Sequence, residues 1–228
     1  MRYQNNFSGW RNALHDAGLV GIVAASDDRI AHLQHLMQSG LPTYDYTFFS
    51  LQDFSLGKGA QEVYGRYDHH VVVRVCPQNE GLPRFTFIDE PYSVVRKVLQ
   101  EKVKDPAVYT AVINEYDPAR YCGVIHALQD KAYVELVREP NLEGLCRGIS
   151  VPWSAEFKAD FPYGFSRMVY HNVEDECIRR IMWSVVKSLI DKSDSGEIPC
   201  YHLAPGYLEF VISEKTGRLF FVDYGATP

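Results

Sequence analysis

The chain has 228 residues, of which 46% are hydrophobic and 23% charged, and its formal net charge is −6 at pH 7. This length and composition are typical of a folded globular protein with one large core, or with two lobes that share a cleft. The negative charge argues against nucleic acid and anionic membranes as non-specific partners, and no apolar run is long enough to cross a bilayer. Five widely spaced cysteines without a CxxC pair, and an N-terminus without a signal-peptide layout, predict a cytoplasmic protein with reduced thiols.

Helices and strands are predicted in separate runs along the chain. The predicted elements, in chain order, are a helix over 27–39, a strand over 71–75, a helix from 91 that closes before 106, three strands between 109 and 139, a helix over 173–191 and a closing hairpin over 207–225. The helix over 173–191 has apolar residues every four positions, and Asn172 is predicted to start it. Runs of strands interrupted by separate helices predict an α+β protein with mostly antiparallel sheets.

Arg74 lies between Val73 and Val75 in the first predicted strand, and a long polar loop with glycine and prolines follows it. Because side chains alternate along a strand, the arginine faces away from both valines and can enter a cleft while they fill the core. Two interpretations stay open. The guanidinium either binds a ligand phosphate or forms a salt bridge with Glu90, Glu135 or another carboxylate.

The closing hairpin carries one carboxylate in each apolar strand, Glu209 in the first and Asp223 in the second. Hairpin pairing predicts that the two lie side by side. Two like charges in a poorly solvated site repel, so either one is protonated or a cation neutralises both. Mg²⁺ prefers oxygen ligands and typically uses one or two carboxylates together with nucleotide phosphates. The alternative is that both carboxylates simply face solvent.

Five segments of the chain resemble, in the same order, the nucleotide-binding domain of phosphoenolpyruvate synthase and pyruvate phosphate dikinase. VRVCPQNEGLPRFTF (73–87) is similar without a gap to that family's VRSSATAEDLPDASF, with Arg74 and Glu80 on the family's residues. The others are LQHLMQSGLPTYDYTFFS, YTAVINEYDPARYCGVIHA, LEGLCRGISVP, where Glu143 is in register, and YLEFVISEKTGRLFFVDYG, where Glu209 matches an acidic ligand. Together they cover most of residues 31–225.

The resemblance implies an ATP-grasp fold of the α+β class, in which two lobes with mostly antiparallel sheets clasp a nucleotide. The lobes would be 1–108, with the phosphate-contacting strand and loop, and 109–228, with the hinge and the metal-ligand hairpin. The implied activity needs ATP and Mg²⁺ and is either phosphoryl transfer of the kinase type or activation of a carboxylate as in a ligase. The resemblance assigns nucleotide contacts to Arg74, Glu80, Asn114, Glu115, Tyr116 and Glu143, and Mg²⁺ to Glu209. Asp223 stands where the family usually has a Gln after the final strand motif, and it is the second candidate Mg²⁺ ligand.

The chain also departs from this family. The family's early Gly-Gly-Lys, whose lysine contacts phosphate, has no counterpart here, and Lys58 in LGKGAQ is the candidate catalytic cation in its place. The family's phosphohistidine domain and pyruvate-handling barrel have no counterpart either, so a protein partner that supplies them is one expectation. The acceptor, a small molecule or a protein, stays open. A second hypothesis is therefore a degenerate, non-catalytic ATP-grasp-like subunit with a binding or regulatory role.

Other polar motifs carry weaker signals. His69 and His70 precede the strand that contains Arg74, and adjacent residues on a strand face opposite ways, which disfavours a shared metal ion. The tyrosines near the N-terminus, among them Tyr44 and Tyr64, are expected to be packing or surface residues. The sequence contains no G-x-S-x-G, no Walker P-loop and no G-x-G-x-x-G, which excludes the commonest hydrolase, mononucleotide and dinucleotide loops.

Overall fold

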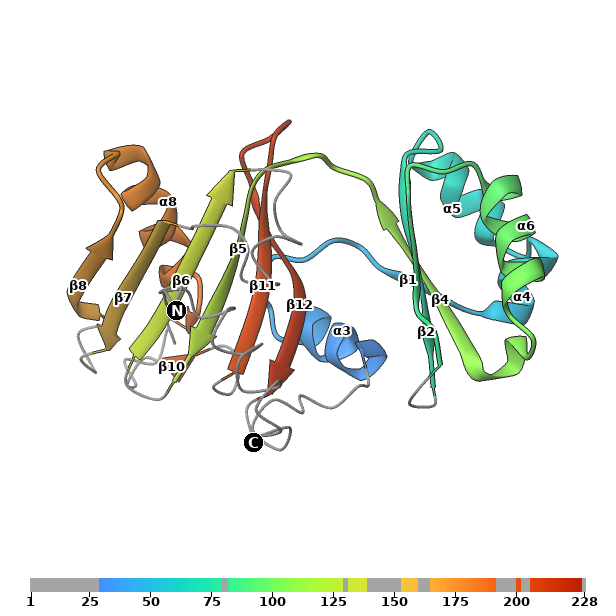
Figure 1. Ribbon diagram of the computed structural model, residues 1–228, viewed down its shortest axis with the longest axis horizontal. Helices are drawn as coiled ribbons and strands as arrows, with labels where there is room; N and C mark the ends of the chain where they lie inside the picture. Colours follow the sequence, from blue (N-terminus) through green and yellow to red (C-terminus); the bar gives the residue numbers. More distant parts are fainter. Residues whose placement is uncertain are drawn as a thin grey trace, which may run out of the picture. The chain divides into compact units, whose positions relative to one another are not determined.

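The computed structural model describes residues 29–78, 82–128, 131–138, 153–159, 165–191, 200–201 and 206–226. Contacts divide the chain into two compact units, a smaller one built on Tyr44–Pro118 and a larger one that includes Ala31–Thr43 and the described part of Ala119–Pro228 (Figure 1). The sequence placed the boundary after residue 108. The structure places it after Pro118, because the strand β4 (Tyr109–Glu115) pairs with strands of the smaller unit on both of its sides.

The smaller unit is a four-stranded antiparallel sheet with helices on one face (Figure 1). The strand order is β1 (Thr47–Ser50), β4, β2 (Val71–Pro77) and β3 (Phe85–Ile88). The helices are α4 (Leu51–Leu56), α5 (Ala60–Arg66) and α6 (Tyr92–Lys102), and a 3₁₀ turn (Pro106–Val108) precedes β4. Val71, Val73 and Val75 pack against the helices in the core, so alternation puts Arg74 on the helix-free face of the sheet.

Local signals explain how the helices of this unit begin and end. The Ser50 hydroxyl accepts a hydrogen bond from the Asp53 N–H at 3.1 Å at the start of α4. Gly57 ends α4 with a φ of 76°, a left-handed conformation in which glycine carries no steric cost. Pro91 precedes α6, which ends three residues before Asp105, in agreement with the predicted second helix.

The larger unit is built on a six-stranded antiparallel sheet. Its strand order is β12 (Leu219–Ala226), β11 (Gly206–Ser213), β5 (Ala119–Ala127), β6 (Lys131–Arg138), β7 (Trp153–Ala159) and β8 (Phe165–His171). The short strands β9 (Ile190–Asp191) and β10 (Cys200–Tyr201) form a separate pair. Leu36 of α3 (Arg29–Gln38) and several residues of α8 (Glu176–Lys187) form one core cluster with Leu208, Phe210 and Phe221 of the sheet.

Helix α8 begins later than the sequence predicted. Its N-cap is Asp175, whose side chain accepts a hydrogen bond from the Cys177 N–H at 2.7 Å, whereas Asn172 lies outside the helix with a φ of 57°. The buried stripe is Ile178, Met182, Val185 and Val186, and Cys177 is exposed. The prediction of Asn172 as the starting residue was wrong because Asp175 is an equally good cap that stands one turn closer to the buried stripe.

The predicted fold class is confirmed. Two units with antiparallel main sheets and separate helices are the composition expected of an ATP-grasp-like α+β protein. Within the described ranges, no helix is both long enough and apolar enough to cross a membrane.

Candidate functional site

Arg74 is held on the helix-free face of the smaller unit by an amide. Its Nη1 donates a hydrogen bond to Oδ1 of Asn114 at 3.2 Å, and Nδ2 of Asn114 donates to the backbone oxygen of Glu115 at 2.7 Å. The Asn114 side chain is only 1% exposed, so both bonds fix its orientation. A guanidinium has five N–H donors, and one hydrogen bond to a neutral amide oxygen leaves further donors available. Arg74 is therefore oriented for a further acceptor. Among the described residues of this unit, its side chain bonds Asn114 and forms no salt bridge with Glu90.

Tyr44 and Asp117 complete this cluster beside Arg74. Burial raises the pKa of Tyr44, the negative charges of Asp117, Tyr46 and Glu115 raise it further, and Arg74 opposes them. Tyr44 is therefore a neutral phenol at physiological pH. Oδ1 of Asp117 is buried and has no hydrogen-bond partner within the part of the chain that the structure describes. The place of these two side chains beside Arg74 was not predicted from the sequence, where Tyr44 was expected to be a packing or surface residue and Asp117 was not singled out.

Asn114, Glu115 and Tyr116, the hinge that the resemblance implies would read the adenine edge with its backbone, already take part in hydrogen bonds. The Tyr116 N–H donates to the His70 backbone oxygen at 2.9 Å, and the Glu115 backbone oxygen accepts from Asn114. A carbonyl oxygen can accept a second hydrogen bond, but an N–H has only one proton to donate. An adenine bound at this hinge would therefore hydrogen-bond to backbone carbonyl oxygens and not to the Tyr116 N–H.

The structure does not bring Lys58 to Arg74. Lys58 lies in the turn between α4 and α5, in the helix layer, where its Nζ is 3.8 Å from Oδ1 of Asp53 and its side chain is 70% exposed. Arg74 lies on the opposite face of the sheet. The remaining predicted nucleotide contacts, Glu80 and Glu143, lie outside the described residues.

Glu209 and Asp223 are direct cross-strand partners in the hairpin of β11 and β12. The register shifts just after Glu209, so that Phe210 pairs with Phe221 and Val222 is left without a partner. This bulge allows Phe221 and Tyr224 both to join the core, while Asp223 lies with Glu209 on the opposite face. Both carboxylates are half-buried. Directly opposed residues have Cβ atoms about 4.5–5.5 Å apart, close enough for one ion to touch both side chains.

A third acidic residue lies in the same row of the sheet. Val124 pairs with Glu209 on one side and with Glu135 on the other, so Glu135 shares the face of the hairpin carboxylates, and it is only 3% exposed. The Tyr207 hydroxyl donates to Oε1 of Glu209 at 3.3 Å. Glu135 was not predicted to lie near the hairpin carboxylates, and it joins this row through the pairing of β5 with β6.

The donor set of the hairpin fits Mg²⁺ bound together with phosphates. In the described ranges, no group of three or more His, Cys, Asp or Glu side chains is arranged to hold a metal ion by itself. Two paired carboxylates match the one or two that Mg²⁺ takes from a protein when nucleotide phosphates and water complete its octahedron. Glu209 and Asp223 are the residues that would hold it.

Comparisons with known proteins find structural likeness only. No family model matches the chain. No curated protein matches it in sequence. Among solved structures, it is similar to a Chryseobacterium gregarium RiPP-associated ATP-grasp ligase in complex with ADP and a leader and core peptide, with 12% identity over 89% of this chain and 52% of that one, at a TM-score of 0.47.

Two further solved structures show the same kind of likeness. One is an N5-carboxyaminoimidazole ribonucleotide synthetase in its ADP complex, with 13% identity over 91% of this chain and 46% of that one, at a TM-score of 0.49. The other is D-alanyl-alanine synthetase A from Vibrio cholerae, with 12% identity over 98% of this chain and 64% of that one, at a TM-score of 0.47. The chain spans about half the length of the first solved structures it matches.

Proposed function

We propose that this chain binds ATP together with Mg²⁺ and is a phosphotransferase or ligase-like protein of the ATP-grasp type. The observation that carries the proposal is the cross-strand pairing of Glu209 with Asp223 on the face of the sheet turned away from the core. Two half-buried carboxylates at directly opposed strand positions repel each other, and the Mg²⁺ of Mg-ATP is a cation that would reduce this repulsion. The resemblance to the nucleotide-binding domain of phosphoenolpyruvate synthase, which the sequence motifs suggested, supports the same ligand.

Arg74 has the matching role toward the phosphates. Its hydrogen bond to Asn114 leaves further donors available, and a planar guanidinium suits the paired oxygens of a phosphate. Mg²⁺, when bound at Glu209 and Asp223, would neutralise charge on phosphoryl oxygens. Arg74 is proposed, from its own unit alone, as a hydrogen-bond donor to a nucleotide phosphate. The acceptor of the phosphoryl group, a small molecule or a protein, is left open by this proposal.

The second candidate function is a non-catalytic nucleotide-binding or regulatory subunit that works with a protein partner. Two observations favour it. Lys58, the one lysine that the sequence offered for the phosphates, lies in the helix layer away from Arg74. The Tyr116 N–H of the predicted hinge donates to the chain itself rather than to a ligand.

A thermal-shift panel with ATP, ADP and GTP, each with and without Mg²⁺, tests the shared part of both candidates. Nucleotide at about a hundredfold over Kd adds roughly 2.7 kcal/mol to the free energy of unfolding. We expect saturable stabilisation by ATP that depends on Mg²⁺. Measured ATP turnover then separates the enzyme from the binding subunit, and the absence of stabilisation by any of the nucleotides contradicts both.

A further inference from the structure

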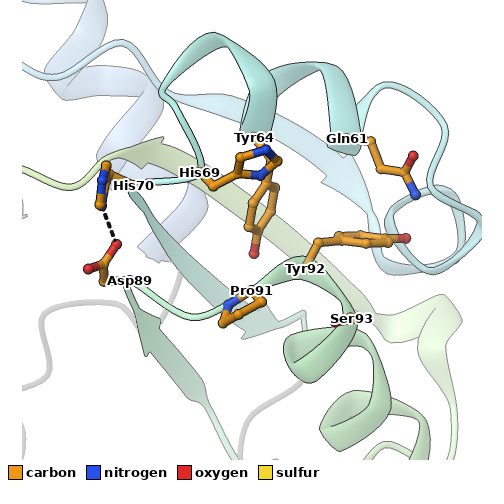
Figure 2. A pocket seen from close by; sticks show the side chains of 8 residues that line it. All are labelled: Gln61, Tyr64, His69, His70, Asp89, Pro91, Tyr92 and Ser93. Carbon is orange, nitrogen blue, oxygen red and sulfur yellow. Dashed lines mark hydrogen bonds and ion pairs between the residues drawn. The ribbon is translucent and has the colours of Figure 1, made fainter.

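A separate pocket lies in the helix layer of the smaller unit, on the other side of the sheet from Arg74. It has a volume of about 720 Å³, and it is lined by α5, by the turn before β2 and by the start of α6 (Figure 2). This volume falls within the range of about 300–1,000 Å³ that small-molecule sites occupy. The predicted roles of Arg74 and of the hairpin carboxylates do not use this pocket.

Tyr64 lines the pocket with a hydroxyl that has no partner. The residue is 1% exposed, and among the described residues its hydroxyl is buried without a hydrogen-bond partner. Figure 2 shows the hydroxyl end of Tyr64 directed toward the side of the pocket formed by Pro91 and Tyr92. Burial raises the pKa of Tyr64, and the nearby Tyr92 and Glu90 raise it further, so the hydroxyl keeps its proton. A buried O–H without an acceptor is unfavourable, and an acceptor oxygen from a ligand relieves that cost.

The start of α6 offers further donors at the same wall. Pro91 is the N-cap of this 11-residue helix, and its side chain makes no capping hydrogen bond. The N–H groups of Val94 and Val95 donate to the Pro91 backbone oxygen, so the donors left for a ligand are the N–H groups at the very start of the helix. The N-terminus of a helix carries a partial positive charge and favours an anion. Ser93, in the first turn, also lines the pocket. The polar groups at this wall therefore select for a ligand that accepts hydrogen bonds.

The remaining walls are aromatic and carry negative charge at the rim. The rings of Tyr64 and Tyr92 meet edge to face with centroids 5.6 Å apart, and the Tyr92 hydroxyl is occupied by a 2.6 Å bond to the Phe54 backbone oxygen. His70 Nδ1 lies 2.8 Å from Oδ1 of Asp89, a pair that lines the pocket and leaves a carboxylate there. A doubly charged phosphate is repelled by Asp89 more strongly than a singly charged carboxylate is.

The backbone around the pocket is strained at three non-glycine residues. Asp68, His69 and Asp89 have φ values of 51°, 67° and 57°, in the left-handed region that is uncommon for non-glycine residues, although Asp and His adopt it more often than most. Strain of this kind persists only where the surrounding structure fixes it, and it is common at ligand sites. Here it holds His69, His70 and Asp89 at the mouth of the pocket.

We propose that this pocket binds a small aromatic monocarboxylate, whose carboxylate accepts hydrogen bonds from the Tyr64 hydroxyl and the first turn of α6 while its ring packs against Tyr92 and Pro91. Each part of this ligand corresponds to a group that lines the pocket. The uncapped helix start and the unpaired phenol provide the donors, the aromatic side chains provide the apolar contact, and Asp89 disfavours a dianion.

The test uses the full chain without nucleotide and benzoate as the probe. We expect benzoate to raise the melting temperature in a saturable way and to shift the NMR signals of residues 61–70 and 89–93. The neutral isostere benzamide, the ring-free acetate and the dianion phenyl phosphate should each bind at least tenfold more weakly. Absence of saturable benzoate binding overturns the proposal. Acetate binding as tightly as benzoate also overturns the proposal, because it would show that the carboxylate binds at the start of α6 without any contribution from the aromatic side chains.

The variant Tyr64→Phe keeps the ring and removes only the hydroxyl. We expect the melting temperature of the ligand-free variant to be equal to or higher than that of the wild type, because a buried unpaired group is lost. Its affinity for benzoate should fall at least tenfold. Tyr109→Phe is the matched control, since Tyr109 lies in the same core but does not line the pocket, and its affinity should stay unchanged. A Tyr64→Phe variant that binds benzoate as well as the wild type contradicts the proposal.

Discussion

Arg74 donates from Nη1 to Oδ1 of Asn114 at 3.2 Å, between strands β2 and β4 of the smaller unit. The two possibilities for Arg74 were a structural salt bridge and a ligand-binding role. An amide partner supports the second, because the group that Arg74 hydrogen-bonds is neutral and no salt bridge is broken when the arginine is removed.

Replacing Arg74 by alanine should therefore affect the ligand and not the fold. We expect Arg74→Ala to leave the melting temperature of the nucleotide-free chain nearly unchanged and to weaken Mg-ATP binding at least tenfold, or about 1.4 kcal/mol. Lys58→Ala is the comparison, since Lys58 is exposed in the helix layer, and we expect it to bind nucleotide like the wild type. An Arg74→Ala variant that unfolds several degrees earlier, with its nucleotide response intact, would show that Arg74 is structural.

Substituting alanine for two glycines, one in a tightly packed strand and one in an open helix position, tests the packing of the fold. A Cβ atom on Gly123, in β5, would lie 2.3 Å from the Phe210 ring and 2.4 Å from the Glu135 backbone oxygen, whereas a Cβ on Gly65, in α5, meets nothing within 4 Å. We expect Gly123→Ala to lower the free energy of unfolding by about 1–3 kcal/mol or more through overpacking. Gly65→Ala should raise it by about 0.5–1 kcal/mol through helix propensity. Urea denaturation of both variants measures this, and equal effects would contradict the described packing of β5.

His126 predicts how stability depends on pH. Burial lowers the pKa of His126 below its usual value of 6.5, so the unfolded chain binds the proton more readily than the folded one. The stability linked to His126 is present above pH 6.5 and is lost as the pH falls through that value toward the folded pKa. We expect the urea midpoint to fall between pH 7.5 and 5.5 by less in His126→Gln than in the wild type. Parallel pH profiles for the two proteins would count against the burial of His126.

The elements that were predicted correctly from the sequence are those with long, regular patterns of apolar residues. The helix opened by Pro91 and the closing hairpin were found with nearly the predicted bounds, because each presents a repeated apolar pattern with a clear boundary residue. Helices α4 and α5 were not predicted, since six and seven residues are too few for a helical period to show. The unit boundary was placed ten residues early, because β4 belongs to the smaller unit through its pairing with β1 and β2, and no local sequence pattern shows that pairing.

The candidate site was predictable where it depends on neighbours along one hairpin. Glu209 and Asp223 stand at matching positions of two adjacent strands, so their pairing followed from the pattern alone, although the bulge at Val222 did not. The cluster of Tyr44, Asp117 and Arg74 joins residues that are tens of positions apart in the sequence, so no local sequence pattern could predict it. The pocket at Tyr64 was missed for the same reason, since its walls come from two helices and two turns.

The central claim is that the hairpin carboxylates bind Mg²⁺ with ATP, and calorimetric titration with a non-hydrolysable ATP analogue tests it most directly. The wild type, Glu209→Gln and Asp223→Asn are titrated with and without Mg²⁺, with Glu214→Gln in the exposed turn of the same hairpin as the control. We predict tight binding only with Mg²⁺ for the wild type and the control, and at least tenfold weaker binding with little Mg²⁺ dependence for the two hairpin variants. Equal affinity and equal Mg²⁺ dependence in all four proteins would contradict the account.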